Sequence, residues 1–232
     1  MHADEPHGQA AEAAHYAVLR RIGPALRHDL IVNLQAVGMM TEVVTARLDR
    51  GLPPLVDVQH HLSRIQRGTR EAMAHSLRVA TWLVPPEDDS TELREGVLEC
   101  IALVRSGLEF RGYAVQADLQ ETDFQVSSAS LRPLLLAALL HLADRERAPG
   151  DLTVSAQIDA GHATLALTRA PARNDDRGHA TPEAEVPYRR MQVADVRALA
   201  QGERADLTLE DHRILIRLQR LVPTSPLRIA PV

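Results

Sequence analysis

Apolar residues recur at steps of three and four along two long stretches of the chain, and this periodicity limits the fold more than any other feature. The first stretch runs from about residue 10 to 50 and the second from 55 to 83. Gly-Leu-Pro-Pro at 51–54 separates them, and glycine and proline end helices and favour a short turn. We therefore expect an antiparallel hairpin of two helices, each roughly 27 to 30 residues or about 40 Å long.

Such a hairpin leaves much of its apolar surface uncovered. Each helix buries one stripe against its mate and the remaining stripe needs another partner, so we expect two chains to form a dimeric four-helix bundle. Gly23-Pro24 interrupts the first helical pattern. A proline inside a helix removes one hydrogen bond and clashes with the preceding turn, which predicts a kink or a new helix start there.

Shorter elements of both kinds follow from residue 90 to about residue 222. Ser90 and the acidic residues before it suit a helix start, whereas residues 170–187 are rich in Pro, Asp, Arg and Ala and predict a long loop. Helices on one face of a mostly antiparallel sheet would make an α+β domain. The expected helices are 92–110, 129–146 and 188–201, and the expected strands are 113–119, 124–127, 152–158, 162–168, 205–210 and 213–221.

The composition excludes several classes of partner. The net charge is −5 at pH 7 and all 26 basic residues are arginine, so the chain has no basic footprint for nucleic acid and no lysine for covalent chemistry. No apolar run approaches about 18 residues and no secretory leader is recognisable, so we expect a cytoplasmic protein that contacts no membrane. Cys100 is the only cysteine and lies in an apolar helical pattern, which predicts a buried structural thiol.

The order of these elements resembles the transmitter region of two-component sensor histidine kinases. His-Asp-Leu at 28–30, inside the first helix, and Leu-Arg-Pro-Leu-Leu-Leu-Ala-Ala-Leu-Leu-His-Leu-Ala-Asp at 131–144 carry the resemblance, which covers nearly all of residues 15–220. It implies a dimerising hairpin over residues 10–85 that carries a phospho-accepting histidine. It also implies a GHKL (Bergerat-like) ATPase-type α/β sandwich over residues 90–222.

His28 is the candidate nucleophile. It lies about 200° around the helix from Leu26 and Leu30, and so faces away from the apolar seam. A neutral imidazole is a good nucleophile near pH 7, and the neighbouring carboxylate of Asp29 is predicted to orient the ring or to accept its proton. The chain has 11 histidines, so the His-Asp pair by itself would also suit an ordinary solvated helix.

Residues around His28 are predicted to meet the partner. Arg21 and Arg27 are expected on nearly one face, where their guanidinium groups would balance the charge of a phosphoryl group. The resemblance implies that a response-regulator receiver domain docks on this face, with part of the second helix. The expected docking residues are Arg21, Arg27, Ala25, Val32 and Gln35. Ordinary helix surface is the alternative interpretation of these positions.

Other polar residues of the hairpin have weaker signals. Kinases of this type often carry Thr, Asn or Ser four residues after the histidine to place a hydrolytic water, whereas Val32 cannot hydrogen-bond one, so phosphatase activity by that route is not expected. Asn33 is predicted to lie on the seam and to set the register of the bundle. The histidines that lack this context are interpreted as surface or partly packed: His15, His60, His61 and His75. No metal site is expected, since His60 and His61 point about 100° apart on a helix.

The resemblance also implies where a nucleotide would bind, and the residues there do not suit one. The family's magnesium-binding asparagines correspond to Ala137 and His141, although magnesium prefers oxygen ligands. The family's two glycine motifs have lost their glycines. The residues in their places are Arg169, Pro171 and Arg173, and then Arg190, Met191 and Gln192. Each lost charge-assisted hydrogen bond is worth about 1.5–3 kcal/mol, so we expect no ATP binding and no cofactor.

These features together resemble the dimeric, kinase-derived phosphotransferases of bacteria, whose ATPase-like domain is degenerate. The resemblance implies a histidine phosphotransfer protein of a phosphorelay. His28 would exchange a phosphoryl group with receiver aspartates, and the receiver would supply the magnesium. Three alternatives stay open: a divergent kinase that still uses ATP, a non-catalytic scaffold that binds and regulates a kinase or response regulator, and a small-molecule sensor that uses the emptied nucleotide pocket.

Overall fold

The computed structural model describes residues 5–51, 55–83, 89–146, 148–172 and 186–221. The chain forms two compact units: the hairpin unit of residues 22–86, and the sheet unit of residues 1–21 together with 87–232. Helix α1 (Glu5–Asp49) contributes to both units. The boundary at Arg21 differs from the one expected near residue 10, because the first turns of α1 belong with the α/β part of the chain.

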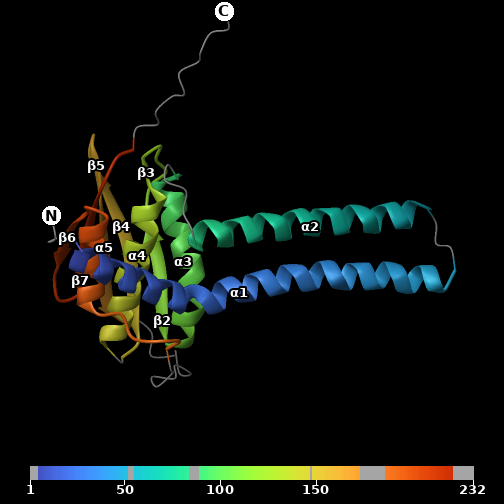
Figure 1. The fold of residues 1–232 in the computed structure, drawn as a ribbon, viewed down its shortest axis with the longest axis horizontal. Helices are drawn as coiled ribbons and strands as arrows, with labels where there is room; N and C mark the ends of the chain where they lie inside the picture. The colour runs from blue at the N-terminus through green and yellow to red at the C-terminus, as the bar shows by residue number, and fades with distance from the viewer. Residues whose placement is uncertain (1–4, 52–54, 84–88, 147, 173–185, 222–232) are drawn as a thin grey trace, which may run out of the picture. The chain divides into compact units, whose positions relative to one another are not determined.

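The hairpin unit consists of α1 from Ile22 onward and α2 (Leu55–Leu83), which lie side by side in Figure 1. Half-buried residues of both helices make the seam: Asn33, Val37, Met40 and Val44 of α1, and Val58, His61, Ile65 and Gly68 of α2. Gly68 lies so close to α1 that a Cβ there would be 2.9 Å from the terminal methyl carbon of Met40. The predicted pair of helices is thus confirmed.

Helix α1 continues through Gly23-Pro24. The prediction of a new helix start at this pair is wrong, since one helix spans Glu5–Asp49 with Pro24 inside it. Pro24 is exposed, and its nitrogen has no hydrogen to donate to the carbonyl of Arg20 one turn earlier. The change from one unit to the other falls between Arg21 and Ile22, directly before the Gly-Pro pair.

The sheet unit is built on a five-stranded sheet of order β2-β4-β5-β7-β6. β2 and β4 run parallel and the other neighbouring pairs run antiparallel, so the predicted, mostly antiparallel sheet is confirmed. Two short strands, β1 (Ser90–Glu92) and β3 (Gln125–Ser127), pair separately. The strands of the main sheet are β2 (Tyr113–Asp118), β4 (Gly150–Ile158), β5 (His162–Pro171), β6 (Asp206–Leu209) and β7 (Arg213–Gln219).

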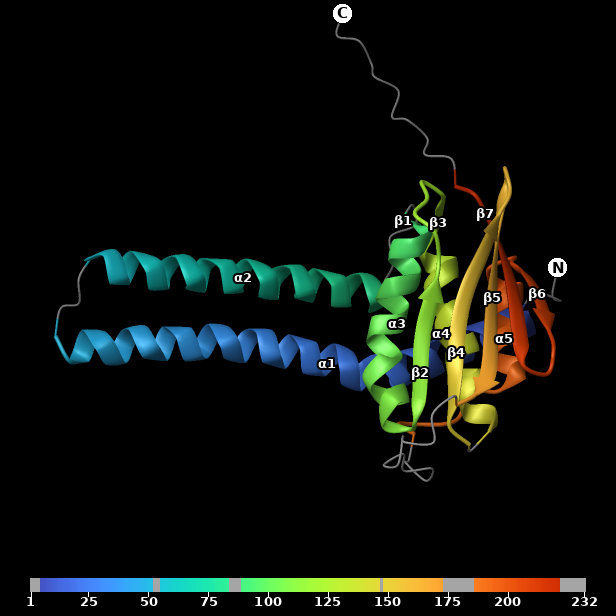
Figure 2. The same cartoon turned by 180° about the vertical axis from the view of Figure 1, so that it is seen from behind.

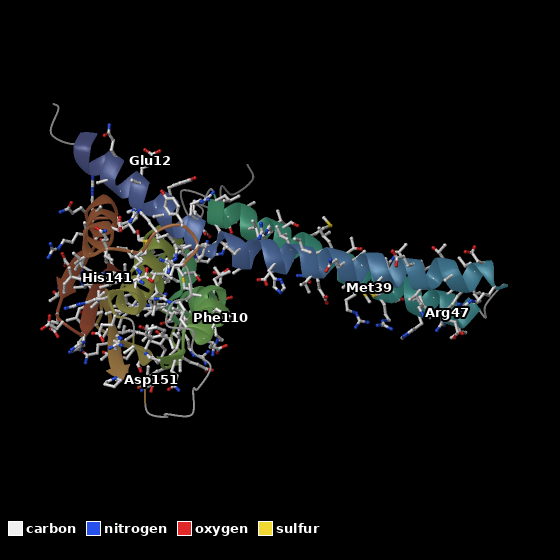
Figure 3. The ribbon with its side chains drawn as sticks, turned by 90° about the horizontal axis from the view of Figure 1, so that it is seen from below. Glu12, Met39, Arg47, Phe110, His141 and Asp151 are labelled. Carbon is white, nitrogen blue, oxygen red and sulfur yellow. The ribbon has the colours of Figure 1, made fainter. Side chains whose placement is uncertain are left out.

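Helices α3 (Leu93–Phe110), α4 (Ser128–Arg145) and α5 (Val193–Gly202) cover one face of this sheet, as Figure 1 and Figure 2 show from opposite sides. The first turns of α1 lie on the other side of α4 from the sheet. Figure 3 shows this order of layers through Glu12 of α1, His141 of α4 and Asp151 of β4. A helix between two layers has no face left for water, which explains why nearly every residue of α4 from 131 to 144 is buried.

Two helices begin later than the sequence predicts. Ser90 is not a helix start, because Ser90–Glu92 form β1 and the carboxylate of Glu92 caps α3 by accepting from the backbone N–H of Arg94 at 2.9 Å. Helix α5 begins at Val193 rather than at residue 188. Tyr188 has φ +76°, a left-handed conformation that a right-handed helix excludes.

Cys100 lies on the buried side of α3 and has no exposed surface. Burial raises the pKa of the Cys100 thiol, and the negative charge of the adjacent Glu99 raises it further. The prediction of a buried, structural thiol is therefore confirmed.

Candidate functional site

His28 lies on the open face of α1 in the hairpin unit. His28, Arg27 and Asp29 are exposed, and among the described residues the His28 ring makes no hydrogen bond, ion pair or ring contact. Val32 is 47% exposed and Gln35 is also exposed, one and two turns further along the same face. The His28 imidazole is therefore accessible to water.

Asp29 does not hold the His28 ring in this structure. Consecutive helix residues point about 100° apart, and no hydrogen bond joins the two side chains in the described part of the chain. The backbone carbonyl of Asp29 accepts a 2.7 Å hydrogen bond from Nδ2 of Asn33, which is half-buried beside the seam. The Asn33 amide is therefore bonded to its own helix.

The structure buries Arg21, which was predicted to be an exposed docking residue. Six residues separate Arg21 from Arg27, which rotates the helix by about 240°, so the two guanidinium groups do not share a face. The Arg21 side chain is 3% exposed, and its Nη1 lies 2.5 Å from Oδ2 of Asp144. Arg21 is consequently unavailable to balance phosphoryl charge at His28, whereas Arg27 remains exposed and Ala25 is half-buried.

Asp144 is the centre of a buried polar cluster in the sheet unit. Its carboxylate accepts from both terminal nitrogens of Arg21, from Nη1 of Arg111 at 2.8 Å and from the backbone N–H of Met191 at 2.8 Å. Asp144 lies in the last turn of α4, where the helix dipole disfavours a negative charge, and the two arginines offset this. Arg111 also donates to the carbonyl of Ala143 at 2.6 Å, which satisfies a free carbonyl of the helix end.

The face of α4 that the resemblance assigns to a nucleotide is closed by the protein's own groups. Ala137, His141 and Asp144 are spaced four and three residues apart and so lie on one face of α4. Ala137 has no exposed surface. The Nδ1 atom of His141 lies 3.0 Å from the carbonyl oxygen of Met191, and the Met191 residue is 2% exposed.

Arg169 is the residue that the resemblance matches to the family's aspartate, and its guanidinium is bonded to other groups of the chain. The residue is 7% exposed, with Nη1 2.6 Å from a carboxylate oxygen of Glu146 and Nη2 donating to the carbonyl of Ala148 at 2.9 Å. Pro171 ends β5. Arg173 lies outside the described residues.

Arg190, Met191 and Gln192, which the resemblance matches to the second glycine motif, directly precede α5. Nη1 of Arg190 lies 3.4 Å from the backbone carbonyl oxygen of Asp144, and Gln192, the residue before α5, donates its backbone N–H to Asp195 at 2.8 Å. A magnesium nucleotide needs oxygen ligands and a close backbone approach. An alanine, an engaged histidine and a buried methionine supply neither, so these residues do not fit one.

Sequence reasoning missed a second contact between α1 and the segment before α5. Tyr188 packs edge-on against Tyr16 of α1 with ring centroids 5.9 Å apart, and the guanidinium of Arg20 lies 5.5 Å from the Tyr188 ring. Arg21 donates to the carbonyl of Arg189 at 2.9 Å. For the buried cluster around Arg21, the sequence offered one signal: Asp144 is an acidic residue at helical spacing from Ala137 and His141.

Two other kinds of site find no support in the described ranges. No group of three or more His, Cys, Asp or Glu side chains there is arranged to hold a metal ion. None of the described helices combines the length and the apolar character that a membrane span requires.

No protein-family model matches the chain, and no curated protein matches it either. Three solved structures that resemble this chain are remote from it in sequence. The mycobacterial sensor histidine kinase MprB is 21% identical over 57% of this chain and 98% of that one, with a TM-score of 0.40. A bacterial phosphotransferase is 15% identical over 88% and 95%, with a TM-score of 0.37. Histidine kinase ThkA, in complex with response regulator protein TrrA, is 10% identical over 95% and 67%, with a TM-score of 0.41.

Proposed function

We propose that this protein is a histidine phosphotransfer protein of a bacterial two-component phosphorelay. His28 accepts a phosphoryl group from a receiver-domain aspartate and donates it to another receiver, and the chain does this without ATP. The observation that carries the proposal is an exposed histidine free of hydrogen bonds on a helical hairpin. The second support is that the nucleotide positions of the sheet unit hold groups that bond to one another.

The proposed phosphoryl transfer needs few groups from this chain. A ring nitrogen of His28 attacks the phosphorus of the aspartyl phosphate, an N–P bond forms, and the P–O bond to the aspartate breaks with its electron pair leaving on the carboxylate. A ring proton passes to water or to the nearby carboxylate of Asp29. The receiver supplies the magnesium that neutralises the phosphoryl oxygens, so in-line positioning is the main contribution of His28 and its helix face.

A homodimer is part of this proposal. One stripe of α2 carries large exposed apolar side chains at helical spacing: Leu55 (72% exposed), Leu62 (48%), Met73 (61%) and Leu77 (66%). A lone two-helix hairpin has nothing within its own unit to cover them. A second copy of the hairpin would bury this stripe in a four-helix bundle and leave His28, on the face of α1 opposite the seam, open to the receiver.

Phosphotransfer with full-length protein tests the proposal. Purified receiver domains of the same organism are charged with radiolabelled acetyl phosphate and mixed with the wild type, with His28→Ala, and with His60→Ala as the matched control on α2. Label should move to the wild type and to His60→Ala and be absent from His28→Ala. Transfer to His28→Ala at the wild-type rate would contradict the role of His28.

The same wild-type and variant proteins distinguish phosphotransfer from the alternative functions. A divergent kinase would acquire His28-dependent, acid-labile label from radiolabelled ATP, which the proposal excludes. A scaffold would bind the receiver or kinase and regulate it equally well after His28→Ala. The proposal instead predicts that binding survives the substitution while phosphoryl flow stops.

A further inference from the structure

The first turns of α1 present one helix face to the rest of the sheet unit. Ala11, Ala14, Val18 and Arg21 recur at steps of three, four and three residues, so they lie on that face. Ala11 is half-buried, Ala14 has no exposed surface, Val18 is 2% exposed and Arg21 is buried. Glu12, labelled in Figure 3, is exposed. Anchors at this spacing are the way in which a groove recognises an amphipathic helix. Residues 8–21 are therefore a docked segment of the sheet unit.

The surface that receives the docked segment comes from α4, α5 and the residues before α5. A Cβ at Gly202, the last residue of α5, would lie 3.0 Å from the Cβ of Ala11, so the two helices approach closely. At the other end of the segment, both terminal nitrogens of Arg21 bond to Asp144 of α4, and Nη1 also donates to the carbonyl of Arg189 at 2.9 Å. A contact between small residues and a buried ion pair thus specify both the direction and the register of the segment.

The docked segment is joined to its site only through a long stretch of chain. Residues 22–86 lie between it and residue 87, where the rest of the sheet unit begins. No short covalent link therefore holds the segment in place, and its own contacts must do so. Three of its anchors are Ala11, Ala14 and Val18, which bury little apolar area, so the ion pair of Arg21 is the strongest source of specificity.

We propose that this face of α4 and α5 is a helix-binding site, that the docked segment is its resident ligand, and that the same segment of a second copy can take its place. An element held by long tethering is the kind that protomers exchange. The ligand class is an amphipathic helix with small apolar residues at steps of three and four and an arginine in its last turn. The inference concerns the sheet unit alone and holds whether or not His28 carries a phosphoryl group.

The experiment uses full-length protein and a fluorescent, amidated peptide of residues 5–21, which stands for the segment of a second copy. Binding is followed by fluorescence anisotropy with the wild type and with Ala17→Glu as hosts. Ala17 has no exposed surface, so a carboxylate there should dislodge the segment of the host's own chain and leave the site intact. The peptide is made with the natural sequence and with Arg21→Met, Arg21→Lys or Arg20→Met. Arg20 is the matched control, since it is exposed and only stacks on Tyr188 at 5.5 Å.

The Ala17→Glu host should bind one natural peptide per chain. The wild-type host should bind none at micromolar concentrations, because its tethered segment competes at an effective concentration of about 1 mM. The Arg21→Met peptide should bind about 100-fold more weakly, since the buried carboxylate of Asp144 then lacks a partner. The Arg21→Lys peptide should be intermediate and the Arg20→Met peptide close to the natural one. Adding Gly202→Val to the host should abolish binding, because its side chain would meet Ala11.

Four results would overturn the proposal. The first is a folded Ala17→Glu host that binds no natural peptide. The second is equal affinity for the natural and the Arg21→Met peptides, and the third is a wild-type host that binds as tightly as Ala17→Glu, since either would place the peptide elsewhere. If Ala17→Glu does not unfold cooperatively on heating, Arg21→Met serves as the host. Failure of both hosts to fold is the fourth result, because the segment would then be an inseparable part of the core.

Discussion

His28 and Arg21 lie seven residues apart on one helix and have opposite surroundings. His28 is exposed, whereas Arg21 is enclosed by groups from α4 and from the segment before α5. Helical geometry alone predicts the orientation of His28 relative to Leu26 and Leu30. It could not predict the burial of Arg21, because the deciding partner, Asp144, is 123 residues away in the sequence.

The Asp144 carboxylate should contribute strongly to stability. Asp144→Asn leaves the buried guanidinium of Arg21 without its counter-charge, and breaking a buried pair in this way costs about 3–5 kcal/mol. Urea unfolding should show a loss of that order. Asp211→Asn, which breaks an ion pair whose carboxylate is 87% exposed, should cost less than about 1 kcal/mol. Equal effects for the two variants would mean that the cluster is not a stabilising centre.

Cys100 should be chemically inert in the folded protein. Thiolate is the reactive species, and burial raises the pKa of this thiol so that it stays protonated at pH 8. A thiol-reactive disulfide reagent should therefore label no cysteine in native protein and one per chain in urea. Rapid labelling of native protein would show that α3 opens readily.

At the scale of elements, hydrophobic periodicity predicted the helices and most strands to within a few residues. The exceptions have local causes that the periodicity does not contain. β1 exists because it pairs with β3, and α5 begins late because Tyr188 is left-handed and Gln192 is extended and caps the helix. Much of the loop expected at 170–187 falls outside the described residues. The packing of Ala14, Ala17 and Val18 against other elements of the sheet unit needed tertiary information.

The exposed stripe of α2 makes a specific prediction about assembly. Leu62→Glu places a charge in the stripe that a second copy would bury, so light scattering during gel filtration should change from a dimer to a monomer. Val56→Glu is the matched control, because Val56 is 73% exposed and lies about 100° around the helix from Leu55. A wild-type monomer, or a dimer that survives Leu62→Glu, would contradict the proposed bundle.

At the scale of the whole molecule, the proposed function requires that the sheet unit keeps its fold without binding a nucleotide. The resemblance predicts from the sequence that Ala137 and His141 replace the family's asparagines. It was not sufficient to show that Met191 and Arg21 fill the same face, because both come from segments distant from α4. The sheet unit is thereby packed from within on a face where the resemblance implies a ligand.

Calorimetry should therefore detect no binding of ATP with magnesium. Titration of full-length protein with millimolar magnesium-ATP should give only heats of dilution, and the midpoint of thermal unfolding should not rise, since a ligand that binds the native state stabilises it. A stoichiometric isotherm, or a clear rise in the midpoint, would show that the sheet unit retains a nucleotide site and would favour the divergent kinase.

The most direct test is to locate a phosphoryl group on this chain after contact with a phosphorylated receiver domain. Peptides are prepared at alkaline pH, where phosphohistidine survives, and mapped by mass spectrometry. The account predicts one modified residue, His28, in the sample mixed with phosphorylated receiver, and none in a parallel sample given magnesium-ATP. A phosphoryl group on any other residue, or on His28 in the ATP sample alone, would contradict it.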